Sequence, residues 1–178
     1  LINSPIGRKV VMSLTGVCLI LFLTFHLCMN VTALFSGDAY NTICELLGSN
    51  WYAIVGTLGL AFLAACHIVY AFILTAQNRR ARGNERYAVT SRRPEVSWAS
   101  QNMLVLGLII LLGLLLHLFN FWYNMMFAEI ANLSTSIEPT DGFGWIEQTF
   151  SNPVYVVLYL VWLAAIWFHL THGFWSAM

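Results

Sequence analysis

Four long apolar stretches constrain this sequence more than any other feature. They run approximately over residues 10–35, 51–77, 99–127 and 154–178. About 20 apolar residues in a helix cross a hydrocarbon core about 30 Å thick, so each stretch can span a bilayer. A chain in lipid must satisfy its own backbone hydrogen bonds, and strands of a membrane barrel would be about half as long. We therefore expect an all-α membrane protein, a transmembrane helical bundle formed by a single domain over residues 1–178.

The composition agrees with a bilayer protein. Only 9% of the residues are charged and the mean hydropathy is +0.72, whereas about a quarter of the residues of a soluble domain are charged. The chain starts without an initiator Met and ends inside an apolar segment, so we expect it to be cut at both ends. The stretch at residues 10–35 is too long for a signal peptide and is followed by further spans, which indicates a true first span.

The charged residues are divided between the two sides of the membrane. All eight Lys and Arg residues precede the first stretch or lie between the second and the third. The positive-inside rule then places the N-terminus in the cytoplasm. Six of the eight acidic residues fall in the two outer connectors: Asp38, Glu45, Glu129, Glu138, Asp141 and Glu147.

Every apolar stretch contains histidine and none contains Asp, Glu, Lys or Arg. The five histidines are His26, His67, His117, His169 and His172. An ionisable residue inside a span is costly and indicates a functional site. A single such histidine is explained equally well by a hydrogen bond to a neighbouring helix, but histidine in all four spans favours a shared function.

The depth of the histidines sorts them into two levels. His26, His67 and His117 each lie twelve residues before the charged residue that ends their stretch. At 1.5 Å per residue this is about 18 Å, just past the midplane of a membrane roughly 40–45 Å thick with its head groups. The chain direction then places His26 and His117 on the outer side and His67 on the inner side. His169, sixteen residues after Pro153, also falls on the inner side.

Two imidazoles from facing helices are a suitable ligand pair for haem iron. The sequence therefore predicts two haem sites, an outer one held by His26 and His117 and an inner one held by His67 and His169. Six-coordinate iron has no open position, which favours electron transfer. No Cys-x-x-Cys-His motif is present, so covalent attachment of haem is excluded.

Two points stay open among the candidate ligands. His172 shares a face with His169, and it is an alternative ligand or a partner of a haem propionate. Gly113 precedes His117 by one turn and Gly173 follows His169 by one turn. These glycines fit the close approach of a flat macrocycle, and equally the helix contacts that glycine commonly makes in membranes.

Three parts of the chain resemble a known family. They are residues 2–16 (INSPIGRKVVMSLTG) with Phe25-His26, residues 99–103 (ASQNM) with 120–126 (NFWYNMM), and residues 167–176 (WFHLTHGFWS). These segments resemble the di-haem cytochrome b anchor of succinate dehydrogenases and fumarate reductases, the succinate:quinone oxidoreductase family, and are most similar to its Bacteroidetes-like branch.

The resemblance implies a subunit of an enzyme in the bacterial cytoplasmic (inner) membrane. It implies five spans, with the fifth beyond the C-terminus, and two haems b ligated by His26, His67, His117 and His169. It also implies docked flavoprotein and iron–sulfur subunits, menaquinone as the carrier, membrane lipid around the spans and no nucleic-acid partner. In some members a Glu for transmembrane proton transfer stands two residues before the fourth ligand, where this chain has Trp167.

Glu45 is the candidate for proton transfer linked to the quinone. It lies on an amphipathic piece around residues 40–47, close to the outer haem level, and its alternative explanation is a solvated surface residue. We expect the Arg-rich segment 78–97 to face the iron–sulfur subunit. Two competing hypotheses are a cytochrome b anchor of another respiratory dehydrogenase and a proton-coupled transporter with a histidine relay. The second is disfavoured because relays usually include Asp or Glu in the spans.

Overall fold

The computed structural model describes residues 4–82 and 98–177, and the described residues are helical with no strand. Their elements are α1 (Pro5–Val31), η1 (Thr32–Leu34), α2 (Gly37–Leu46), α3 (Trp51–Arg82), α4 (Trp98–Gln101), α5 (Met103–His117), η2 (Leu118–Phe127), α6 (Ala128–Ile130), α7 (Gly142–Phe150) and α8 (Pro153–Ala177). Of the Arg-rich segment, residues 83–97 lie outside the described residues.

Four helical segments of the described chain are long and apolar enough to cross a membrane. They are Ile6–Leu34, Trp51–Ala81, Met103–Ile130 and Pro153–Phe174. The prediction of an all-α transmembrane bundle is confirmed, and the protein is a multi-pass membrane protein. Many of the large apolar side chains on these segments point outward, as lipid-facing residues do; Leu112 and Phe62, for example, are 68% and 69% exposed.

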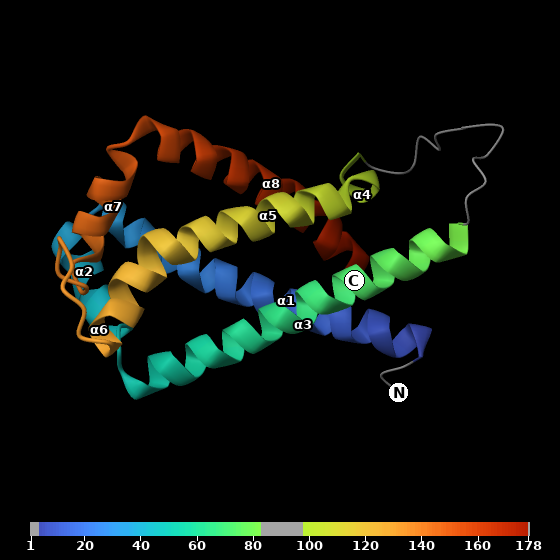
Figure 1. The fold of residues 1–178 in the computed structure, drawn as a ribbon, viewed down its shortest axis with the longest axis horizontal. Coiled ribbons are helices and arrows are strands. Elements are labelled where there is room, and N and C mark those ends of the chain that lie inside the picture. The colour runs from blue at the N-terminus through green and yellow to red at the C-terminus, as the bar shows by residue number, and fades with distance from the viewer. Residues whose placement is uncertain (1–3, 83–97, 178) are drawn as a thin grey trace.

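The long helices pack in two pairs that meet at α1. Helix α3 packs along α1, α5 packs along α8, and α1 also contacts α8. Figure 1 shows these helices crossing at shallow angles, with the start of α1, the end of α3 and α4 at one end of the bundle. Four chain segments far apart in sequence therefore pack side by side in one bundle.

The opposite end of the bundle is closed by a cap formed by α2, α6 and α7 (Figure 1). Ser36 begins α2 by accepting a hydrogen bond from the amide of Ala39 at 3.2 Å, and Asp141 begins α7 by accepting one from Gly144 at 3.0 Å. These are the usual roles of Ser and Asp at a helix N-terminus. Sequence analysis predicted α2 as an amphipathic piece but treated the segment that contains α7 only as an acidic connector.

The third spanning segment changes its helical type in the middle. After His117 the α-helix continues as a π-helix, η2, for ten residues. The side-chain amide of Asn124 donates to the carbonyl oxygens of Phe119 and Asn120 at 3.0 and 3.1 Å. Short π-helical segments are rare and occur frequently at functional sites. Here the segment directly follows one of the histidines.

Candidate functional site

The outer histidine pair lies between α1 and the end of α5. The rings of His26 and His117 are perpendicular, with centroids 5.8 Å apart. Phe22, one turn before His26, stacks on its ring at 5.5 Å. Since α1 and α5 are far apart in sequence, only the fold of the bundle brings these two imidazoles together.

Aromatic rings surround His117 on its other sides. The centroids of Phe121, Trp162 and Tyr159 lie 5.3, 5.5 and 6.3 Å from the centroid of His117. Tyr159 is buried and accepts a hydrogen bond at 3.3 Å from the amide of Asn120, a buried residue of η2. The outer pair therefore has a nearly apolar environment.

Trp162 occupies the space next to Gly113. A Cβ atom at Gly113 would overlap the indole, and the indole Nε1 donates to the carbonyl oxygen of Ile110 at 3.0 Å. Gly113 thus admits a side chain of the facing helix α8. Of the two explanations left open for this glycine, the structure favours a helix contact over the approach of a flat macrocycle. Among the described residues, no atom lies within 4 Å of a Cβ built on Gly173.

The inner histidine pair lies between α3 and α8. The ring centroids of His67 and His169 are 6.4 Å apart, at an interplanar angle of 69°. His67 also faces α1, where its Nδ1 is 3.2 Å from the hydroxyl of Thr15. Sequence analysis missed Thr15 because a single Thr in an apolar helix shows no pattern.

One nitrogen in each pair is left without a partner. The Nδ1 atoms of His117 and His169 are buried and have no hydrogen bond in the described structure. A buried polar atom without a hydrogen bond costs about 1–3 kcal/mol, and most such atoms in native proteins have a partner. These two atoms are therefore candidate positions for a bound polar group.

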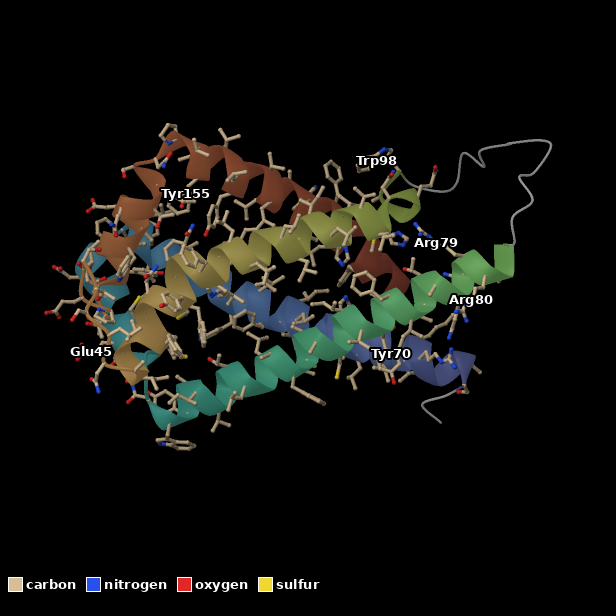
Figure 2. All side chains as sticks on the ribbon, in the orientation of Figure 1. Glu45, Tyr70, Arg79, Arg80, Trp98 and Tyr155 are labelled. Atoms are coloured by element: carbon tan, nitrogen blue, oxygen red, sulfur yellow. The ribbon has the colours of Figure 1, made fainter. Side chains whose placement is uncertain are left out.

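The remaining site candidates lie outside both pairs. His172 is half-buried and belongs to neither ring pair. Glu45 is exposed at the capped end of the bundle (Figure 2), where it lines a polar hollow of about 220 Å³ together with Asp38 and Asp141. The structure thus does not bring Glu45 to a histidine. Its role in proton transfer stays a prediction.

The cap is held together by polar contacts that sequence analysis did not find. The amide of Asn41 donates to Asp141 at 2.7 Å, and its oxygen accepts from the backbone amide of Phe143 at 2.8 Å. Within the cap, burial raises the pKa of the Cys44 thiol, and burial together with the neighbouring thiol raises the pKa of Tyr40. Both groups are therefore neutral at physiological pH.

The described residues contain no group of three or more His, Cys, Asp or Glu side chains that could hold a metal ion. Each histidine pair offers two imidazoles and no carboxylate or thiolate.

A comparison with protein families gives one match over most of the chain. Residues 8–172 match the model of the family described as serpentine type 7TM GPCR receptor class ab chemoreceptor. The name of that family specifies seven membrane spans, and the described part of the chain contains four candidates. No curated protein and no solved structure matches the chain.

This match contradicts the functional predictions made from the sequence. The resemblance to the succinate dehydrogenase and fumarate reductase anchors is overturned, and with it the assignment as a subunit of a quinone-linked enzyme. The two haems b, menaquinone as substrate, and the flavoprotein and iron–sulfur partners are withdrawn for the same reason. The alternative transporter hypothesis has no support either. The structure still brings four histidines together in two pairs, and the role of these pairs is proposed below.

Proposed function

Because the chain belongs to the family of serpentine type 7TM class ab chemoreceptors, we propose that it is a membrane receptor that binds a small, lipid-soluble molecule. The binding positions are the two histidine pairs inside the bundle. The apolar part of the ligand packs against the aromatic rings around His117, and its polar group bonds to imidazole nitrogen.

The observation that supports this proposal is that each histidine pair contains one buried nitrogen without a partner, Nδ1 of His117 in the outer pair and Nδ1 of His169 in the inner pair. A hydroxyl group offers one donor and two acceptor lone pairs, so it can bond to a histidine in either tautomer. The two rings in each pair are neighbours, with centroids 5.8 and 6.4 Å apart. We therefore propose a lipophilic alcohol or phenol as the ligand class.

The orientation of the receptor follows from its charges. Arg79 and Arg80 lie at the end of the bundle opposite Glu45 (Figure 2). With the positive-inside rule, this arrangement supports an N-terminus in the cytoplasm and a cap of α2, α6 and α7 on the outer side.

Thermal unfolding of the purified chain in detergent tests the proposal. A panel of lipophilic phenols and alcohols is added to the parental protein and to the double variant His26→Ala/His117→Ala. A ligand at 100 times its dissociation constant stabilises a protein by about 2.7 kcal/mol, which for a chain of this size raises the melting temperature by roughly 5–10 °C. We expect this rise in the parental protein and its reduction in the double variant.

His172→Ala is the control, because it removes a histidine of a spanning helix, α8, that belongs to neither pair. It should respond to the panel as the parental protein does. If no compound raises the melting temperature, the histidine pairs are not the binding positions. If the double variant responds as the parental protein does, the outer pair is not a binding position.

A further inference from the structure

The environment of the inner pair assigns different roles to the two nitrogens of His67. Thr15 is buried on α1, with a relative exposure of 5%. Its hydroxyl donates to the carbonyl oxygen of Val11 at 2.7 Å and lies 3.1 Å from that of Met12. The same hydroxyl lies 3.2 Å from Nδ1 of His67 on α3.

A hydroxyl has one proton to donate and two lone pairs that accept. The contact with the carbonyl oxygen of Val11, at 2.7 Å, is shorter than the contact with Nδ1 of His67, at 3.2 Å. We therefore assign the proton of Thr15 to its own helix, and the hydroxyl then accepts at His67. The Nδ1 atom must then be the donor, and in a neutral imidazole the other nitrogen, Nε2, keeps its lone pair. The hydroxyl of Thr15 therefore determines the tautomer of His67.

The packing also fixes the orientation of the ring. Cε1 of His67 faces Gly16, 3.7 Å from the position that a Cβ would take there. The contact with Thr15 and the approach to Gly16 thus turn the edge of the ring formed by Nδ1 and Cε1 toward α1. Since Nδ1 faces Thr15, Nε2 is on the other side of the ring.

We infer that Thr15 is a positioning residue that makes His67 present the lone pair of Nε2 to the bundle interior. This inference rests on the proposed ligand-binding function only in its last step, which is that the inner position accepts a ligand with a proton to donate. The tautomer itself is a property of the ligand-free protein. Among the described residues, Nδ1 of His117 in the outer pair has no hydrogen-bond partner, whereas Nδ1 of His67 in the inner pair contacts Thr15. The two positions therefore differ in hydrogen-bonding character.

The test is a nitrogen-15 NMR spectrum of the full chain in detergent, labelled at histidine. Protonated and unprotonated imidazole nitrogens have well separated chemical shifts, and the His67 signals are identified by their loss in His67→Gln. We expect Nδ1 of His67 to be protonated in the parental protein and in Thr15→Ser, which keeps the hydroxyl. In Thr15→Val, which has the same shape without the hydroxyl, the proton should move wholly or partly to Nε2.

A parental spectrum with the proton on Nε2 of His67 would overturn the inference, as would a Thr15→Val spectrum identical to the parental one. If Thr15→Val does not fold, the parental and Thr15→Ser spectra still decide the tautomer. A second arm uses p-cresol, a phenol that donates a proton, and its methyl ether, which cannot. If neither compound binds to any variant, the proposed function is refuted. The NMR result tests the role of Thr15 alone.

Discussion

Replacing Gly113 with alanine should destabilise the bundle more than any other single methyl group added to α5. The indole of Trp162 lies where the new Cβ would be, and it is held there by its hydrogen bond of 3.0 Å to the carbonyl oxygen of Ile110. The indole is a rigid ring, so it cannot relieve the overlap by rotating a terminal group away, as a flexible side chain would. Either α5 and α8 must move apart or Trp162 must leave its position.

The size of the effect can be worked from these two contacts. Overpacking of this kind costs about 1–3 kcal/mol, and loss of the indole hydrogen bond costs about 1 kcal/mol more. The higher helix propensity of alanine returns up to about 1 kcal/mol. Gly113→Ala should therefore lose about 1–3 kcal/mol of unfolding free energy.

Gly107→Ala is the matched control on the same helix. A Cβ at Gly107 has no atom within 4 Å, so only the propensity gain applies and the variant should be as stable as the parental protein or slightly more stable. The assay is reversible unfolding in mixed micelles with SDS, followed by circular dichroism. In the Trp162→Ala background the Gly113→Ala change should cost almost nothing, because the clashing ring is gone. Equal stabilities of Gly113→Ala and Gly107→Ala would refute this reasoning.

Three further predictions concern the cap and the π-helix. Asp141→Ala should destabilise the cap by about 1–2 kcal/mol, because it removes an N-cap and the bond from Asn41; urea-dependent proteolysis measures the change, and parental resistance would contradict it. Because the pKa values of Cys44 and Tyr40 are raised in the folded state, their stabilising contribution is complete below about pH 9 and is lost as the pH rises further. A plot of melting temperature against pH should therefore be flatter in the Cys44→Ala variant than in the parental protein. An unchanged slope counts against the burial of this thiol. Asn120→Ala should cost about 1 kcal/mol by removing its hydrogen bond to α8, and hydrogen exchange of the π-helical amides should rise; unchanged exchange argues that the bond is unimportant.

The fold was predictable because its signal is repeated along the whole chain. Four apolar stretches of sufficient length require helices in lipid, and the amphipathic pattern around residues 40–47 predicts α2. Helix α7 could also have been found, since Asp141 before the run Gly-Phe-Gly-Trp is a suitable N-cap. The π-helix after His117 was not predictable, because the contacts of its side chains, such as that of Asn120 with Tyr159 on α8, form only in the folded chain.

The site was predictable only in part. Counting residues from the ends of the spans gave the relative depths of His26, His67, His117 and His169, and the structure places the same residues in neighbouring pairs. The contacts of Thr15 and Trp162 depend on how the helices are rotated about their axes, which residue counts do not determine. The prediction of the chemical function was wrong. It depended on the resemblance of short segments, whereas the match over residues 8–172 is to another family.

The absorption spectrum of the purified chain tests the central claim most directly. The chain is produced in cells supplied with a haem precursor, so that a haem protein would be loaded, and the reduced-minus-oxidised difference spectrum is recorded. A receptor that uses its histidine pairs for a small alcohol or phenol should show no haem bands. An α-band that is lost in His26→Ala or His67→Ala would contradict the receptor assignment and restore the cytochrome b hypothesis.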